Sequence, residues 1–549
     1  MITSRFARHC FAAMVCAALT SCAGIAPPPD RPRLVVFLVV DGLPQWQVLA
    51  YRDQLAPDGL ARFLDRGAWL ADAHHGHAVT ATAPGHAALL TGAYPNRTGI
   101  IGNEWPDLNT GAEIYNTGDS SATYIGHKTR VLDGTSPKNL KVETVGDILR
   151  RVDARSKVIS IAGKDRGAIL LAGRSGTAYI YMDASGQFAS STFYMAEHPD
   201  WVNAFNVRKP ADRYFKTEWK PLLPEAAYAR SVPDNQPWFG LRGGKLPMMM
   251  GVAADDAPGP AFYGALLKGP FVDALSLEFA RAAIAGERLG RDDAPDILTV
   301  SLSGHDYVNH AYSAESRISH DHLLQLDRQF QAFFGDLDAM IGGDNYIAVL
   351  TSDHGFMPAP EYSQSQGRAA GRLSRSQTLG RINAELERSF GAPKLAIQLS
   401  AFQLLLDRKL IAQKGLDFDA VAETARATLV AVPAIAAAYT RRELEEGSRA
   451  GAPFFEEIHK SWNKDVSGDV QFVIKPFWMS SSSTSVATHG SPHPYDNHVP
   501  ILVYGPKWVR PGRVDGHVDA VDIAPTLARW LGVPAPAASE GRLLPLRAP

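Results

Sequence analysis

The sequence has almost no cysteine. Its three cysteines, Cys10, Cys16 and Cys22, all lie close to the N-terminus. The rest of the chain therefore cannot form an intramolecular disulfide or a thiolate metal site. Any metal bound there must be held by nitrogen and oxygen ligands. Internal repeats and coiled-coil heptads are also absent, which argues against a solenoid or a fibrous architecture.

The sequence also has little excess charge of either sign. It contains 55 basic and 57 acidic side chains, for a formal net charge of −2. This balance gives no indication of nucleic-acid binding or of attachment to a membrane surface through charge. Of the 549 residues, 45% are hydrophobic and 20% are charged, so the chain has ample apolar material for a large globular core.

The N-terminal segment is typical of an export signal. Arg5 and Arg8 precede a short apolar run, Phe11 to Leu19, which is too short to span a bilayer. We predict that residues 1–22 are a signal peptide and that the mature protein is exported to the periplasm.

The end of this segment resembles a bacterial lipobox. In Leu19-Thr20-Ser21-Cys22, the cysteine would be lipidated and would anchor the protein to the outer membrane. Ordinary cleavage near Ala23 is the alternative. Residues 23–32 are rich in proline and are predicted to be a short tether before the fold begins.

Buried strands alternate with helical patterns over the rest of the chain. Five apolar, β-branched runs predict strands: Arg33 to Val40, Lys157 to Ala162, Asp296 to Ser303, Tyr346 to Ser352 and Val499 to Tyr504. Helical patterns occupy Glu143 to Val152, Phe271 to Ile284, Ser316 to Ile341 and Ala520 to Leu531. The continuous apolar runs indicate strands that are buried on both faces. We therefore predict an α/β fold with a mostly parallel sheet sandwiched by helices.

Two stretches break the alternation of strands and helices. Residues from about 179 to 260 are rich in tryptophan, tyrosine, proline and asparagine, and residues from about 358 to 485 mix helices with loops. We interpret both as capping insertions in a single catalytic domain that covers residues 33–549.

Polar side chains of metal-ligand type follow several predicted strands. Asp41 follows the first, Asp353 and His354 follow the fourth, and Asp306 and His310 lie four residues apart after the third. In parallel sheets, ligands gather at the carboxyl ends of the strands. Taken alone, each of these residues is equally well explained as a turn, a helix cap or a polar loop.

A sixth candidate ligand, His489, lies near the C-terminal end of the second insertion. His493 and His498 compete with it on composition alone. Three aspartates and three histidines could form two three-ligand sites, each with open coordination positions, and this ligand set suits zinc.

Thr82 lies just before a predicted helix. Pro84 suits the first turn of that helix. A hydroxyl at a helix N-terminus can face an anion, and a divalent metal can activate it as a nucleophile. The alternative is that Thr82 only caps the helix.

Several motifs resemble those of the alkaline phosphatase superfamily. TATAPGHAALLTGAYPNRTGIIGNEW resembles its nucleophile segment, and DGLP, SGHDYVNH, SDHG and THGSPHPYDNHVP resemble its metal motifs in the expected order. GKDRGAIL resembles the phosphate-irrepressible, single-Thr alkaline phosphatases, whose fold is similar to that of the type I phosphodiesterases and nucleotide pyrophosphatases. The resemblance covers nearly the whole chain after residue 33.

The resemblance implies a role for each matching residue. Thr82 would be the nucleophile, Asn103 would contact a phosphate oxygen, and Lys164 and Arg166 would reach the transferred phosphoryl group. One metal would be held by Asp306, His310 and His489, and the other by Asp41, Asp353 and His354, with Thr82 between them. The THG context favours His489 over the other two histidines. Ala311 and Tyr312 replace a Gly-Pro pair that is common in the family.

The predicted function is that of a metal-dependent alkaline phosphatase. It would hydrolyse small phosphate monoesters through a phospho-threonine intermediate, with two divalent metal ions, for which zinc is favoured. If their segment is extended, Lys164 and Arg166 point to the same side, and their charges suit a monoester dianion better than a diester. The alternatives are a nucleotide phosphodiesterase of the same superfamily and an exported binding lipoprotein without enzyme activity. A sulfatase is disfavoured, because the sequence has no C-x-P-S-R motif.

Overall fold

The computed structural model describes residues 31–251, 255–481 and 485–549, without the side chains of residues 240–242 and 481. The predicted signal peptide, including Cys22, and most of the tether lie outside the described residues. Among the residues described, none of the helices combines the length and the apolar character that crossing a membrane requires.

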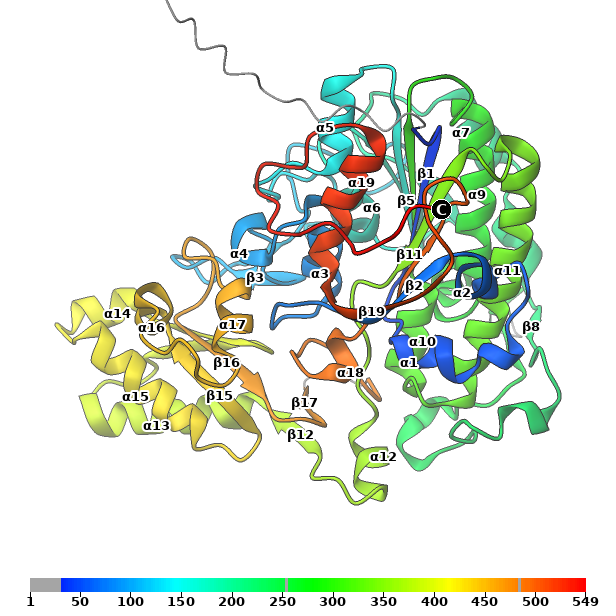
Figure 1. Ribbon diagram of the computed structural model, residues 1–549. Coiled ribbons are helices and arrows are strands. Elements are labelled where there is room, and N and C mark those ends of the chain that lie inside the picture. The colour runs from blue at the N-terminus through cyan, green and yellow to red at the C-terminus, as the bar shows by residue number, and fades with distance from the viewer. Residues whose placement is uncertain (1–30, 252–254, 482–484) are drawn as a thin grey trace, which may run out of the picture.

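A nine-stranded sheet forms the centre of the molecule (Figure 1). In spatial order its strands are β19 (Gly512–Asp519), β2 (Ala68–His74), β18 (Ile501–Tyr504), β11 (Tyr346–Thr351), β1 (Leu34–Val40), β10 (Asp296–Leu302), β5 (Val158–Ala162), β6 (Thr177–Met182) and β7 (Gln187–Ala189). All strands except β18 and β7 run in the same direction. The sheet is therefore mostly parallel, as predicted.

The central strand explains why the sequence reads as an unbroken apolar run. Every residue of β1 is buried, because β10 and β11 flank it and helices cover both faces of the sheet. The run Val499 to Tyr504 has the same character but forms an antiparallel strand, β18. An apolar run reports burial and not strand direction, so the sequence could not distinguish this strand from its parallel neighbours.

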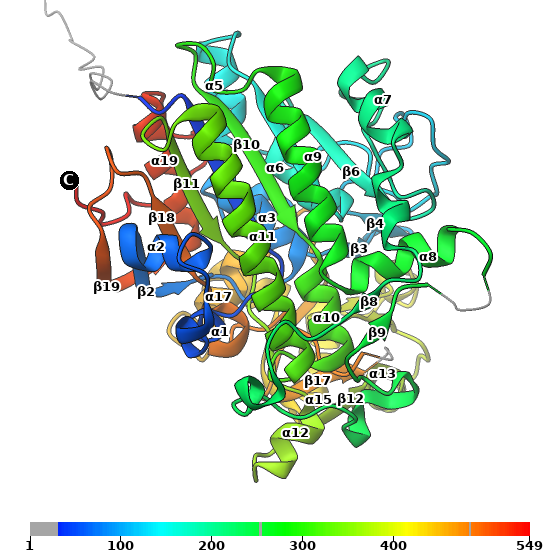
Figure 2. The same cartoon turned by 90° about the vertical axis from the view of Figure 1, so that its right-hand side faces the viewer.

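Two layers of helices enclose the sheet (Figure 2). One layer contains α3 (Thr82–Thr91), α5 (Val145–Val152), α6 (Asp165–Ala172) and α19 (Ile523–Leu531), and the other contains α2 (Leu60–Arg66), α9 (Phe271–Glu287), α10 (Gly304–Tyr312) and α11 (Arg317–Ile341). A separate hydrophobic core lies between the sheet and each layer. Shorter helices include α1 (Gln45–Ala50), α4 (Pro95–Thr98), α7 (Asp200–Val207), α8 (Pro260–Ala265) and α18 (Pro494–Asn497).

The segment predicted as the second insertion contains a smaller α/β unit with its own core. Its sheet has the order β13 (Ala396–Leu399), β14 (Gln403–Leu406), β16 (Val470–Ile474) and β15 (Ile435–Thr440). Helices α13 (Arg375–Phe390), α14 (Arg408–Gln413), α15 (Phe418–Val430), α16 (Arg441–Glu446) and α17 (Phe455–Ser461) belong to it. The unit lies beside the large sheet (Figure 1) and is joined to it near α12 (Pro360–Ser365) by the paired strands β12 (Gly371–Ser374) and β17 (Trp478–Ser481).

The segment predicted as the first insertion is less regular. It completes β6, adds the edge strand β7, and continues through α7 and the short pair β8 (Glu218–Trp219) and β9 (Met248–Met249). A further pair, β3 (Glu104–Pro106) and β4 (Glu113–Tyr115), precedes α5. The division of the chain into one domain with two insertions stays a prediction.

Candidate functional site

The three predicted aspartate ligands meet at one edge of the large sheet. Asp41 follows β1 directly, Asp353 lies two residues beyond the end of β11, and Asp306 lies in the first turn of α10, just after β10. β1 pairs in parallel with both β10 and β11, so the carboxyl ends of these strands lie together. All three side chains are buried. The fold therefore collects three carboxylates in a place from which water is largely excluded.

Two histidines join these aspartates closely, and a third lies at the edge of the group. Nε2 of His354 lies 3.5 Å from Asp41 and 3.4 Å from Asp353, and Nε2 of His489 lies 3.5 Å from Asp306. The rings of His354 and His489 stack with centroids 3.4 Å apart. The cluster thus contains two tight groups, Asp41 with Asp353 and His354, and Asp306 with His354 and His489.

His310, the sixth residue of the predicted ligand set, faces the same Asp306 oxygen as His489. Its Nε2 lies 3.4 Å from the Asp306 carboxylate, one helical turn along α10, as the four-residue spacing predicts. Its ring also lies close to that of His489, at 5.1 Å between centroids. The competing candidates point elsewhere: Nε2 of His493 contacts the carbonyl of Ile474 and that of His498 contacts the carbonyl of Ala71.

Backbone carbonyls orient the three ring systems. The Nδ1 atoms of His310, His354 and His489 lie 3.0, 2.8 and 2.9 Å from the carbonyl oxygens of Ala487, Gly355 and Thr80, respectively. A carbonyl accepts hydrogen bonds only, so each neutral ring carries its proton on Nδ1 and presents the Nε2 lone pair to the carboxylates. This arrangement is typical of histidines that bind a metal through Nε2.

The resulting contacts are unfavourable without a cation. Oδ1 of Asp41, Oδ1 of Asp306, Oδ2 of Asp353 and Nε2 of His354 are buried and have no hydrogen-bond partner among the described residues. In a buried site, an imidazole lone pair and the anionic oxygens that it faces repel each other, as do neighbouring carboxylates. The nitrogen and carboxylate donors, with no thiolate, match a zinc-type divalent metal. The residues present therefore fit a divalent metal centre.

The pKa shifts in the cluster follow from the same crowding. Burial, reinforced by the neighbouring Asp353, raises the pKa of Asp41 well above its usual value. Burial also opposes the ionisation of Asp306, but the Lys164 ammonium and the three neighbouring histidines together outweigh it and hold the pKa of Asp306 well below its usual value. Burial lowers the pKa of both His354 and His489, which keeps these rings neutral and able to act as ligands.

Thr82 is the first residue of α3 and lies beside this cluster. Its side chain is buried, and its hydroxyl forms no hydrogen bond within the described part of the chain. The helix-cap alternative therefore does not apply, because the N-cap residue is Ala81. Gly85 explains how α3 comes so near: a Cβ atom there would lie 2.1 Å from the carbonyl oxygen of Asp353.

His86 is a residue of the site that sequence reasoning missed. Its Nδ1 lies 3.1 Å from Oδ2 of Asp353 and 2.8 Å from the carbonyl oxygen of Thr82, and its Nε2 lies 2.8 Å from Ser301 Oγ. His86 thus links the start of α3 to a carboxylate of the cluster. Its spacing of four residues from Thr82 places both on one helical face, and this was the signal available in the sequence.

The predicted phosphate-contacting residues surround the start of α3. Oδ1 of Asn103 accepts a hydrogen bond of 2.9 Å from the backbone N–H of Ala83. The amide Nδ2 of Asn103 has no hydrogen-bond partner among the described residues. This leaves a donor, held by Ala83 next to Thr82, that can bind an anionic oxygen.

Lys164 and Arg166 are both at the site, but not in the way that alternation predicts. The segment is not extended throughout: β5 ends at Ala162, Lys164 is the N-cap residue of α6, and Arg166 is the second residue of that helix. The Lys164 ammonium lies 2.7 Å from Asp41 and 2.5 Å from Asp306. Arg166 donates a hydrogen bond of 3.2 Å to the hydroxyl of Tyr115. Both side chains line a cavity of about 180 Å³.

Two tyrosines that the sequence did not single out support these cations. The ring of Tyr307 lies 5.0 Å from the Lys164 ammonium, and the hydroxyl of Tyr115 donates to Asp165 as well as accepting from Arg166. Nothing in a single sequence marks these two tyrosines, because their partners at the start of α6 are distant from them in the chain.

Comparison with known proteins gives a consistent picture. Residues 35–496 match the family model of type I phosphodiesterase / nucleotide pyrophosphatase. The chain is 33% identical over 516 residues to alkaline phosphatase PafA of Elizabethkingia meningoseptica, covering 93% of this chain and 94% of that protein. The crystal structure of wild-type alkaline phosphatase PafA superposes with a TM-score of 0.87 at 32% identity, covering 94% of this chain and 99% of that chain.

Two further relatives have similar coverage. Alkaline phosphatase PhoV of Synechococcus elongatus is 32% identical over 528 residues, covering 94% of this chain and 92% of that protein. A protein of Myroides odoratus named as a calcium-transporting ATPase is 34% identical over 524 residues, covering 93% of this chain and 94% of that protein.

The carboxylate cluster leads to a prediction about metal binding. Chelator-treated wild-type protein should gain thermal stability when Zn²⁺ is added, because an ion that binds only the folded state stabilises it, by about 4 kcal/mol at 1,000 times the dissociation constant. Asp41→Asn should lose most of this gain. Differential scanning calorimetry with and without Zn²⁺ measures it, and Asp344→Asn, which alters an exposed carboxylate, is the control. An equal zinc-dependent shift in wild type and Asp41→Asn would contradict the assignment.

Proposed function

The chain belongs to the type I phosphodiesterase / nucleotide pyrophosphatase family, and we propose that it is an alkaline phosphatase that hydrolyses phosphate monoesters. The observation that carries this proposal is the position of Thr82: a buried hydroxyl without a hydrogen-bond partner in the described residues, at a helix N-terminus, beside a metal-type cluster. The likeness to PafA over nearly the full length of both proteins supports the choice of a phosphatase.

Thr82 is the proposed nucleophile. Its Oγ attacks phosphorus in line and forms a phospho-threonine as the bond to the leaving oxygen breaks. Water then attacks the phospho-threonine, which releases inorganic phosphate and restores the hydroxyl. The α3 N-terminus, where backbone N–H groups point outward, favours the negative charge that develops there.

Two divalent metal ions, for which we propose zinc, would act as Lewis acids that stabilise negative charge on the attacking and leaving oxygens. Asp41, Asp353 and His354 would hold one ion, and Asp306, His310 and His489 the other. The backbone carbonyls described above keep all three imidazoles in the tautomer that metal binding requires.

Asn103, Lys164 and Arg166 are the proposed phosphate-binding groups. The free amide of Asn103 and the two cations suit the non-bridging oxygens of a phosphoryl group. With two divalent ions, three aspartates, a Thr82 alkoxide and these two cations, the site would carry a net charge of about +2, which a monoester dianion balances. A diester carries only one negative charge, so it balances the positive charge of the site less well. This charge balance is our reason for proposing a monoesterase over a phosphodiesterase.

We expect Thr82→Ala to lower kcat for an aryl monophosphate by at least about 10³-fold, since the covalent step is lost. Its zinc content, measured by elemental analysis, should stay near that of wild type. Thr91→Ala is the matched control, because Thr91 is a buried threonine of the same helix whose hydroxyl bonds to the carbonyl of Ala87. Wild-type turnover in Thr82→Ala would exclude Thr82 as the nucleophile.

Substrate choice provides a second prediction. Wild type should hydrolyse an aryl monophosphate faster than a diaryl phosphate, and Lys164→Ala should lower kcat/KM for the monoester by about 10²-fold, with a smaller effect on the diester. Lys157→Ala serves as the control, because Lys157 pairs with Glu287 at the opposite end of β5. A wild-type preference for the diester would instead identify the chain as a phosphodiesterase.

We also propose export to the periplasm with a lipid anchor on Cys22. The basic start, the short apolar run and the lipobox-like sequence support this proposal. Labelled palmitate should be incorporated by cells that express wild type and not by cells that express Cys22→Ser. Equal labelling of both would exclude the anchor.

A further inference from the structure

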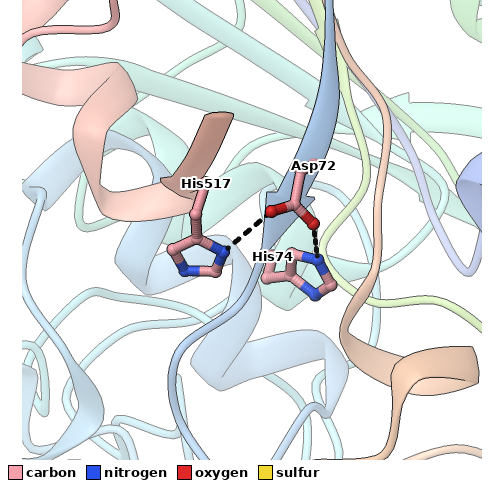
Figure 3. Close-up of side chains that lie close together, drawn as sticks. All are labelled: Asp72, His74 and His517. Atoms are coloured by element: carbon pink, nitrogen blue, oxygen red, sulfur yellow. Dashed lines mark hydrogen bonds and ion pairs between the residues drawn. The ribbon is translucent and has the colours of Figure 1, made fainter. Parts of the chain in front are cut away.

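A second group of metal-ligand side chains lies at the edge of the large sheet, apart from the site described above. Asp72, His74 and His517 each offer one ligand atom, and these atoms all lie within 4.8 Å of one another. Figure 3 shows the Asp72 carboxylate between the two imidazole rings. We propose that these three residues form an accessory binding site for a divalent metal ion of the zinc type.

The sheet itself places the three side chains together. Asp72 and His74 lie two residues apart on β2 and therefore project from the same face. His517 of the parallel strand β19 is the register partner of Asp72. A β-bulge in β19 makes this possible: the register shifts between Val514 and His517, and the inserted Gly516 has a φ of 105°.

The bulge has a specific consequence for the ligands. Val514 pairs with Leu70, so an uninterrupted ladder would place Gly516, which has no side chain, opposite Asp72. The extra residue brings His517 into that position instead. Bulges commonly re-aim a side chain at the edge of a sheet. All three ligands therefore stand on paired strands and not on loops.

An outer hydrogen bond fixes the ring of His74 for metal binding. Asn497 donates its Nδ2 to the carbonyl of Pro492 at 3.0 Å, so its Oδ1 is the acceptor for Nδ1 of His74 at 3.1 Å. A neutral His74 then presents the lone pair of Nε2 to Oδ1 of Asp72, at 2.7 Å. A lone pair and a carboxylate oxygen repel each other at this distance unless a proton lies between them or a metal ion that binds both holds them about 3 Å apart.

The neighbouring histidine holds this arrangement in place without being a ligand in it. The ring of His498 stacks on that of His74, at 4.4 Å between centroids and 12° between planes, and its Nε2 contacts the carbonyl of Ala71. An isolated β-bridge also pairs His74 with His498. The ring of His74 is therefore fixed on one side by stacking and at Nδ1 by Asn497.

Two imidazole nitrogens and one carboxylate suit zinc or a neighbouring transition metal better than calcium or magnesium. Asp72 and His517 are half exposed or more, so water can fill the remaining coordination positions. The alternative is a surface ion pair between a protonated His74 and Asp72, which would need no metal. Neither possibility depends on the proposed phosphatase activity.

The experiment is equilibrium dialysis of the holoenzyme against a series of buffered free Zn²⁺ concentrations, with bound zinc measured by elemental analysis. Wild type should bind one equivalent of zinc per chain more than His517→Ala and Asp72→Asn, which should behave alike. Both variants should hydrolyse an aryl monophosphate within twofold of the wild-type rate, which shows that they are folded. The zinc-binding isotherms of wild type and His517→Ala would coincide if the ion pair were the correct explanation, and this overturns the proposal.

Two controls separate this site from the others. His459→Ala removes an exposed histidine elsewhere and should retain the additional equivalent; loss of the same equivalent there would indicate adventitious binding and overturn the proposal. His354→Ala, which disables the cluster at the strand ends, should still lose one equivalent when His517→Ala is added. No change on that addition would mean that the extra zinc belongs to the cluster, which also overturns the proposal.

Discussion

The repulsion among buried carboxylates at the ends of β1, β10 and β11 is the constraint on which the rest of the site depends. Asp41, Asp306 and Asp353 would each prefer water, yet each has an oxygen without a hydrogen-bond partner among the described residues. A parallel sheet brings these positions together because its strands end at one edge. The fold can keep such a cluster only if positive charge compensates for it.

The chain supplies part of that compensation and much of the rigidity. The Lys164 ammonium lies between two of the carboxylates, and His86 contacts the third. Gly42, with a φ of 72°, lets the chain turn sharply after β1 so that its N–H donates to Asp353. These contacts fix the carboxylates before any ligand arrives, and preorganised charge of this kind is what electrostatic catalysis requires.

The sequence predicted the sheet well because burial on two faces leaves a clear signal. The strand runs and most of the long helices lie where the apolar patterns place them. The direction of β18 was not predictable, because the same run suits either direction. The Asp306 and His310 pair was predictable from its helical spacing, whereas Thr82 read as a helix cap until the motifs around it were considered together.

The residues that sequence reasoning missed were missed for a different reason. Tyr115 and Tyr307 act through contacts that the tertiary fold creates, and no local pattern encodes these contacts. His86 had a local signal in its spacing of four residues from Thr82, but its contact with Asp353 also depends on the tertiary fold. Lys164 and Arg166 were found through a motif, but the assumed extended backbone was wrong, because a helix begins between them. The two cations reach the site from two positions at the start of α6: Lys164 from its N-cap and Arg166 from its first turn.

In the cluster of Asp72, His74 and His517, the electrostatic repulsion between ligand atoms is weaker than at the strand ends. Its members are partly exposed, so water can stabilise their charges and the fold has no need of a compensating cation there. At the strand ends, burial makes neutralisation a condition of stability. A metal at the sheet edge would therefore be optional for folding, whereas charge compensation at the strand ends is obligatory. This difference explains why the Lys164 ammonium lies among the central carboxylates, whereas no lysine or arginine contacts Asp72 in the described part of the chain.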